Sequence, residues 1–486
     1  MNQDNRRLTG LCLSFFVLFF AFFAASNQVA PTLGDLGKTS LAILYSAFAV
    51  SALITPSFLQ CLANRSNNDN NKCDNNNDNN DNKDNNNNDN HQQSNSLRAE
   101  TTALILGSAL YAPYLFACSL GTKDSARWIQ LLSSGLLGIG AGFLWVAQGS
   151  LLTASCTTQN RGRWSGIFWA SFMSGNAVGN FATAGALTKF PISSVFLGLS
   201  GVSLLSTLTL WIFVRPRTGN MEVSNMYART TLLTGVGEEN ANANANENTM
   251  EADISSGLYE DIVKLWQALN TTSVQTLLPL ILFIGCENSF WGGAFTDVVS
   301  TKHDSNDVAM VSGVLASADI ISSILTGMLL DIYRIDARLL LSVGLLSLIA
   351  GSILVWMEKN KLEMDVAMLN TSTPSSSSSS SSSTASSSSM WMIYVAGIGM
   401  GVGDGICNTV AIMRLQVLSV RYRLMSRRTA FQLFQCVNVA MTSITFVILS
   451  QYPATKSNVV WYVFECLAIL SGLCLIGNRQ AYTEED

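Results

Sequence analysis

Uninterrupted apolar runs of about 20 residues recur along almost the whole chain, and no other feature limits its possible folds as strongly. A helix that crosses a bilayer needs about 20 apolar residues. Only 13% of the 486 residues are charged, roughly half the share found in soluble domains. The runs are too long and too uniform for the alternating strands of an outer-membrane barrel. The sequence therefore predicts an all-α polytopic membrane protein.

The runs fall into two groups of six, which gives a bundle of about twelve transmembrane helices. The predicted spans are Leu8–Ala30, Ser40–Leu62, Ala99–Leu120, Trp128–Ser155, Trp164–Leu187, Ile192–Val214, Ser273–Val299, Val308–Ile332, Ala337–Met357, Met390–Leu415, Thr429–Ser450 and Val459–Ile476. They define an N-terminal half (1–214), a cytoplasmic linker (215–272) and a C-terminal half (273–486). An Asn/Asp-rich insert (66–96) and a Ser-rich insert (371–389) lack core-forming residues, so we expect both to be disordered.

Lysine and arginine concentrate in segments that would share one side of the membrane, which predicts that both termini are cytoplasmic. Asn370, in an Asn-Thr-Ser sequon, then lies outside and is a candidate for glycosylation. Residues 258–269 have the pattern of an amphipathic helix at the membrane surface. The first run also resembles a cleavable signal peptide, but its length favours a retained span. We expect a plasma-membrane, endosomal or vacuolar location.

A glycine-rich motif occurs once in each half. Gly138-Ile139-Gly140-Ala141-Gly142 closely matches the start of the stretch Gly397–Arg414, and a pair of arginines follows each copy at similar spacing. The match predicts two parallel halves related by an axis along the membrane normal, although glycine-rich helices can also resemble each other by chance. Glycines four residues apart let a neighbouring helix approach closely. In this register Trp145 stands where Asp404 stands.

Away from the first and last few residues of the predicted spans, acidic residues occur only in the second half, at Glu287, Asp319, Asp404 and Glu465. A charge at the centre of a span costs about 2.5–3.5 kcal/mol, so such a group needs a partner, a cavity or a proton. Asn408 lies one turn from Asp404 and shares its helix face. The simpler alternative is hydrogen bonding that only stabilises the bundle, at roughly 0.6 kcal/mol per contact.

In the first half the intramembrane polar groups are neutral amides. Together with the acids they predict a polar cavity at mid-membrane, between the halves, with charge on one side only. The residues predicted to line this solute or ion pathway are Asp404, Asn408, Asp319, Glu287, Asn288, Gln148, Trp145, Asn176, Asn180 and Gln28.

A short turn after the eighth span carries both an acid and two bases, Asp331, Arg334 and Arg338. These charges would suit an ion-pair latch that opens as the halves move. Ordinary helix capping and cytoplasmic flanking charge are the alternative explanation.

Motifs of enzyme chemistry are not found: the sequence has no phosphate loop, zinc-ligand spacing or nucleophile elbow. Its two histidines fall in predicted loops. We therefore expect no enzyme activity, no cofactor or metal, and no nucleic-acid partner.

The six-plus-six layout and the turn at Gly327–Arg338 resemble the major facilitator superfamily. Several segments are more narrowly similar to Unc-93-like proteins: Gly138–Gln148, Ser165–Trp169 with Gly175, Gly179 and Asn180, Ser317–Asp319, Gly403–Gly405 and Ala430–Phe434. The resemblance implies a facilitator-type fold of twelve helices. It also implies solute transport, regulation of potassium channels and potassium balance, or trafficking of membrane receptors. Glu287 departs from the family pattern, because an amide would be expected there.

Two functional hypotheses follow. The first is a secondary transporter that moves a small solute or a cation, such as a proton or potassium, by alternating access. The second is a non-transporting membrane protein that regulates a potassium channel or accompanies a receptor subunit. In both cases the lipid bilayer is a partner.

Overall fold

The computed structural model describes residues 3–74, 86–121, 124–155, 161–214, 250–371, 387–421, 427–452 and 458–477. Within these ranges the chain is helical and contains no strand. The first half comprises α1 (Gln3–Leu33), α2 (Asp35–Asp74), α3 (Asn86–Ala109), α4 (Tyr111–Ser119), α5 (Asp124–Ser155), α6 (Arg161–Leu187) and α7 (Ile192–Phe213). The rest comprises α9 (Met250–Leu269), α10 (Thr272–Ser289), η3 (Phe290–Phe295), α11 (Thr296–Lys302), α12 (Ser305–Asp331), α13 (Ala337–Thr371), α14 (Ser387–Arg421), α15 (Arg427–Gln451) and α16 (Val459–Gly477).

The predicted all-α polytopic fold is confirmed. Ten described helices are long and apolar enough to cross a membrane, and α16 adds a shorter apolar stretch, Val459–Cys474. The α6 helix is not among the ten, and two asparagines and several serines and glycines interrupt its apolar sequence. The exact number of twelve spans stays a prediction.

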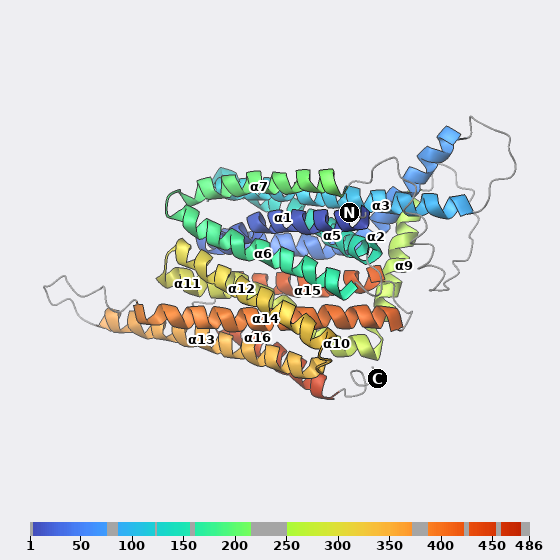
Figure 1. Cartoon of the computed structure of the whole chain (residues 1–486). Coiled ribbons are helices and arrows are strands. Elements are labelled where there is room, and N and C mark those ends of the chain that lie inside the picture. The colour runs from blue at the N-terminus through green and yellow to red at the C-terminus, as the bar shows by residue number, and fades with distance from the viewer. Residues whose placement is uncertain are drawn as a thin grey trace.

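The two groups of helices form two neighbouring parts of one bundle (Figure 1). The first-half helices lie on one side and α10–α16 on the other, with α2 packed on α15 and α6 packed on α12 across the boundary. The helix α9 crosses the end of the bundle at which α1 begins and α16 ends (Figure 1). We refer to this as the α9 end and to the opposite one as the far end.

The α9 helix has one face on the bundle and one face exposed, as the amphipathic pattern predicts. Leu265 and Ala268 pack with Leu433 of α15, while the rings of Tyr259 and Trp266 are exposed. An apolar exposed face with aromatic rings is typical of a helix in the membrane interface.

Helical structure extends into both flanks of the predicted disordered inserts. The Asn/Asp-rich insert begins within α2, which continues to Asp74, and α3 starts at Asn86. The Ser-rich insert begins at the end of α13 and ends within α14, which starts at Ser387. Extending an existing helix needs no new nucleus and is therefore easier than starting one. The centres of the inserts, 75–85 and 372–386, lie outside the described residues.

The glycine helices of the two halves pack in the same way. A Cβ atom on Gly138 of α5 would overlap the carbonyl of Leu44 in α2. A Cβ atom on Gly401 of α14 would overlap the carbonyl of Leu315 in α12. Glycine is needed at both positions because backbone meets backbone there.

A second face of the same helices repeats the correspondence. Gly140 approaches the carbonyl of Gly107 in α3, and Gly403 approaches the carbonyl of Gly344 in α13. Two independent contacts in each half therefore align the glycine motif 138–142 with residues 401–405. The predicted duplication holds at the level of helix packing.

This correspondence corrects the register expected from the sequence by four residues, about one helical turn. Asp404 corresponds in packing to Ala141, and Asp319 of α12 corresponds to Phe48 of α2; Trp145 is not the counterpart of Asp404. The sequence match was misleading because glycine recurs every four residues in α14, so a slip of one turn still aligns glycine with glycine. Only the contacts distinguish the two registers.

Candidate functional site

A cavity of about 640 Å³ lies between the two halves. Its wall extends from mid-bundle residues such as Asp404 and Trp145 to Ile332 at the α9 end, whose side chain is 65% exposed. Toward the far end the wall stops at Phe23 and Tyr45. The cavity therefore opens toward the α9 end.

Asp404 forms part of this wall although it is almost fully buried. Asn408, one turn further along α14, also lines the cavity, and its side-chain amide donates a hydrogen bond to the Asp404 carboxylate. The helical spacing predicted from the sequence thus produces a direct contact.

Glu287 of α10 and Asp319 of α12 are completely buried next to Asp404. Their carboxyl groups are close enough to the Asp404 carboxyl to interact with it electrostatically. Ser323 donates a hydrogen bond of 2.9 Å to Oδ1 of Asp319. Neither Asp319 nor Glu287 lines the cavity, whereas Asp404 does, and Ser323, the hydrogen-bond donor to Asp319, lines it as well. We call Glu287, Asp319 and Asp404 the acid cluster.

The acid cluster contains unsatisfied atoms. Both carboxyl oxygens of Glu287 and Oδ2 of Asp319 have no hydrogen-bond partner among the described residues. An ionised carboxylate only accepts hydrogen bonds, so two carboxyl groups can bond to each other only when one carries a proton. A proton held within the cluster would let two of its carboxyl groups share a hydrogen bond and would remove the cost of one buried charge.

The first-half wall of the cavity is aromatic. Trp145 has ring-to-ring distances of 5.6, 5.5 and 5.2 Å to Phe15, Phe19 and Phe172. Gln148 lies one turn after Trp145 near this wall and also lines the cavity. The polar groups of the two halves therefore face one space, but the first half contributes no acid to its described lining.

The remaining predicted pathway residues do not all reach the cavity. Asn288 lines it and donates to Asn438 of α15 at 3.3 Å. Asn176 and Asn180 do not line it: Asn27 of α1 donates to Asn180, which in turn donates to Asn176 at 2.7 Å. This chain of amides joins α1 to α6. Such contacts fit the alternative of bundle stabilisation.

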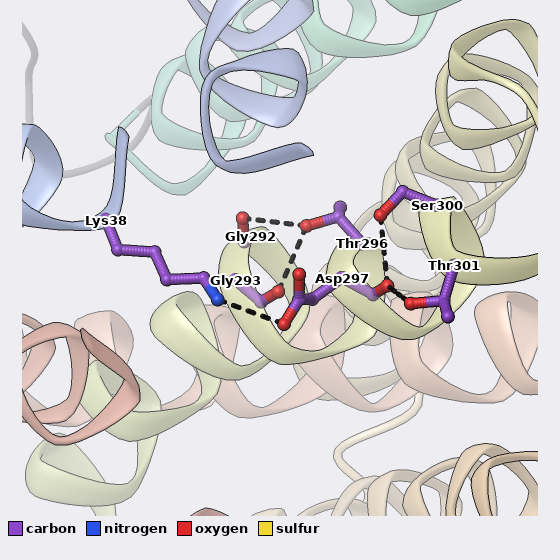
Figure 2. A network of polar contacts seen from close by, with 7 residues as sticks. All are labelled: Lys38, Gly292, Gly293, Thr296, Asp297, Ser300 and Thr301. Carbon is purple, nitrogen blue, oxygen red and sulfur yellow. Dashed lines mark hydrogen bonds and ion pairs between the residues drawn. The ribbon is translucent and has the colours of Figure 1, made fainter. Parts of the chain in front are cut away.

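The far end is closed by contacts that cross between the halves. Gln28 of α1 donates to the carbonyl of Ser305 in α12 at 3.0 Å. Figure 2 shows Lys38 extending from α2 to Asp297 of α11, where Nζ lies 3.1 Å from Oδ2. The two side chains are only 5% and 17% exposed. Removing one partner of such a buried ion pair strongly destabilises the folded protein, because the remaining charge stays buried without a partner.

A π-helical segment, η3, lies between α10 and α11, just before Asp297. Widening a helix in this way disturbs its regular hydrogen bonds, and Thr296 compensates by donating to the carbonyls of Gly292 and Gly293 (Figure 2). Ser300 and Thr301 donate to the carbonyl of Asp297. Single π turns are frequent at functional sites.

Of the latch predicted at the turn after α12, the structure describes the side chains of Arg334 and Arg338. Arg338 bonds to Asp336, two residues earlier in the same turn, with Nη2 and Oδ2 at 2.7 Å. This contact lowers the pKa of Asp336. Arg334 is exposed and has a positive φ of 49°, whereas the side chain of Asp331 lies outside the described residues.

Sequence reasoning missed several charged groups that lie largely buried, among them Lys38, Asp297 and Glu100. Lys38 and Asp297 were not singled out because they lie near the ends of apolar runs, where charged residues commonly flank a membrane span. Glu100 was overlooked for the same reason: it is buried in α3 and accepts a hydrogen bond of 2.5 Å from Ser150 of α5. The first half is therefore not free of buried charge. A signal was present, since each residue falls within a candidate span.

The described residues contain no group of three or more histidine, cysteine, aspartate or glutamate side chains placed to hold a metal ion.

These features define a multi-pass, all-helical membrane protein whose two halves enclose a central cavity. The family described as "Ion channel regulatory protein UNC-93" matches residues 95–476. The chain belongs to the UNC-93 family, which confirms the resemblance seen in its glycine motifs.

Three curated relatives indicate how distant the similarity is. The chain is 23% identical to UNC93-like protein MFSD11 of Xenopus tropicalis over 336 residues, 65% of this chain and 64% of that protein. It is 21% identical to UNC93-like protein 3 of Arabidopsis thaliana, over 65% and 58% of the two chains. It is also 21% identical to Notoamide biosynthesis cluster protein O' of Aspergillus versicolor, over 49% and 46%. The matches thus span less than two thirds of the relatives' lengths.

Proposed function

We propose that this protein is a secondary transporter that works by alternating access and couples solute movement to a proton. The observation that carries the proposal is the asymmetry of the cavity along the membrane normal. The cavity opens at the α9 end, while the buried pair Lys38–Asp297 closes the far end. Rocking of one half against the other would break this pair and close the α9 end, as in other two-half transporters.

The acid cluster would provide the proton site. Asp404 is the member of the acid cluster that lines the cavity, so it would exchange a proton with the cavity and pass it to Glu287 and Asp319. Intramembrane carboxyl groups are the usual components of proton relays in transporters. We further propose that the α9 end is cytoplasmic and that Asn370 is glycosylated on the opposite side.

Cysteine labelling can test alternating access without knowledge of the substrate. The full-length protein, with its native cysteines replaced, receives one cysteine at Tyr45 or at Met413, which lie toward the two ends of the cavity. A membrane-impermeant maleimide is applied to sealed vesicles of each orientation. We expect Met413→Cys to react from the α9 side, Tyr45→Cys to react from the far side, and the two reactivities to change in opposite directions with pH.

Asp404→Asn in the same background should leave labelling independent of pH, because the group that exchanges the proton is gone. Labelling of wild type that does not respond to pH, or that alternates equally in Asp404→Asn, would contradict the proposal. A cysteine at Gln267, exposed on α9 at the end of the bundle, controls for general changes in reactivity.

A second candidate function is regulation of a channel without transport. The family's description as ion channel regulatory proteins favours it. In that case the cavity would be a remnant and the outer helix faces would bind a partner subunit. Crosslinking in native membranes, followed by purification of the full chain, would reveal a stoichiometric channel or receptor subunit. A protein recovered alone, with pH-dependent labelling, would exclude this candidate.

A further inference from the structure

The cavity combines one acid with many aromatic rings and contains no base. No lysine, arginine or histidine is found among the described residues that line it. Asp404 is its one ionisable acid. In a low-dielectric environment an unbalanced carboxylate strongly favours a cation and repels an anion.

The aromatic rings give the cavity a second preference. Trp145, Phe172, Trp291, Tyr45 and Phe48 all line it. The face of an aromatic ring attracts a cation, and Trp does so most strongly. The same rings offer large apolar surfaces, which a small hydrated inorganic ion cannot use.

The size of the cavity agrees with an organic ligand. Pockets for small organic molecules are typically about 300–1,000 Å³ and are mostly apolar with a few placed polar groups, and this one measures about 640 Å³. Asn408, Gln148 and Asn288 supply such polar groups.

We propose that this cavity binds a monovalent organic cation with a bulky aromatic or apolar body, and that the cation competes with a proton for Asp404. The ammonium or phosphonium centre would lie beside the carboxylate, and the apolar body would lie against the rings of the first half. The inference deepens the proposed transport function and rests on it for the direction of movement, but not for binding itself.

Competition with protons follows from the surroundings of Asp404. The ionisable groups that face it are Glu287 from α10, Asp319 from α12 and the Cys407 thiol of its own helix. The only other ionisable side chains in the described cavity lining are the hydroxyls of Tyr45 and Tyr111. Among the described residues that line the cavity there is no basic side chain to balance an ionised Asp404. We therefore expect Asp404 to take up either a proton or an external cation.

Binding of tritiated tetraphenylphosphonium to the purified full-length protein in lipid nanodiscs tests this. Tetraphenylborate has the same shape and the opposite charge, so it separates charge recognition from apolar partitioning. We expect saturable phosphonium binding that weakens as the pH is lowered, and borate competition at least about tenfold weaker, which corresponds to about 1.4 kcal/mol.

Three variants make the result specific. Asp404→Asn should lower phosphonium affinity by about tenfold or more and should abolish its pH dependence. Trp145→Leu should lower affinity while leaving the pH dependence in place, because it removes a ring and keeps the acid. Glu465→Gln is the matched control: it neutralises a half-buried acid of α16, which bonds to Ser352 and does not line the cavity.

Absence of saturable phosphonium binding to folded wild type, or equal affinity of wild type and Asp404→Asn, would overturn the inference. Phosphonium binding without pH-dependent cysteine labelling would uphold the binding site and refute the transport proposal. Alternating labelling without phosphonium binding would do the reverse.

Discussion

The α5 and α14 helices pack against their neighbours in the same way, but they carry different side chains at equivalent positions. Both bring a Gly-x-Gly-x-Gly face against two neighbouring helices at backbone contact. Yet the packing counterparts of Asp404 and Asp319 are Ala141 and Phe48. The four residues hold equivalent packing positions in the two halves, but only the second half has acids at these positions.

This contrast shows which part of a duplicated fold is constrained. Backbone contact tolerates only glycine, so both copies keep it. Side chains beside the glycines face a neighbour or a cavity, where a carboxyl, a methyl or a ring can each be accommodated. The two halves have therefore kept a common scaffold while only one of them carries the acid cluster. Four predictions test this contrast.

The largest expected effect comes from the contact that holds the halves together. Lys38→Met leaves Asp297 buried without a partner, at a cost of about 3–5 kcal/mol to the closed far end. Far-side labelling of Tyr45→Cys should rise by more than about tenfold. Adding Asp297→Leu removes the stranded charge and should restore most of the protection. Unchanged labelling of the single variant would show that the pair does not hold the far end closed.

Moving the acid to the other half should not move its function. Ala141→Asp introduces a carboxyl whose neighbour is Phe48 and whose insertion costs about 2.5–3.5 kcal/mol. The double variant Ala141→Asp/Asp404→Ala should therefore lack pH-dependent labelling, because Glu287 and Asp319 remain in the second half. Recovery of the pH response would show that an acid in either half is sufficient, which would contradict the requirement for Glu287 and Asp319 beside it.

Glycine substitutions should affect the two halves equally. Gly138→Ala and Gly401→Ala each force a Cβ atom against a backbone carbonyl, and overpacking costs about 1–3 kcal/mol. Thermal unfolding should show similar losses for both. Gly198→Ala in α7, where nothing lies within 4 Å of the added atom, is the control and should be neutral or slightly stabilising. A loss confined to one half would break the packing equivalence.

The smallest effect is expected at the exposed turn after α12. Asp336→Asn removes a surface pair worth roughly 0–1 kcal/mol. Because Arg338 lowers the pKa of Asp336, the folded state binds this proton less readily than the unfolded state does. The stabilisation is present above the ordinary carboxyl pKa and is lost as the pH falls through the lowered value. Thermal unfolding across that acidic range should show wild type and variant converging; a constant difference would exclude the titration.

Much of the fold was predictable because bilayer thickness forces long apolar helices, which are visible in sequence. The acids Glu287, Asp319 and Asp404 could likewise be singled out, since each one is costly in its span. Their convergence could not be derived from the sequence, because it depends on which faces of α10, α12 and α14 meet.

Other features depended on contacts between distant residues. The pair Lys38–Asp297 brings together residues 259 positions apart, and no local pattern marks it. The register of the glycine motif was ambiguous because the motif repeats within itself. The π turn before Asp297 has no distinctive composition that would have separated it from a regular helix.

The central claim is that the acid cluster of the second half holds a proton that exchanges through Asp404. Infrared difference spectra of the full-length protein in liposomes, recorded between mildly acidic and mildly alkaline buffer, observe the carbonyl band of protonated carboxyl groups directly. We predict that this carbonyl band disappears at alkaline pH in wild type and in Glu465→Gln. In Asp404→Asn the band should not change with pH. Identical spectra for wild type and Asp404→Asn would contradict the account.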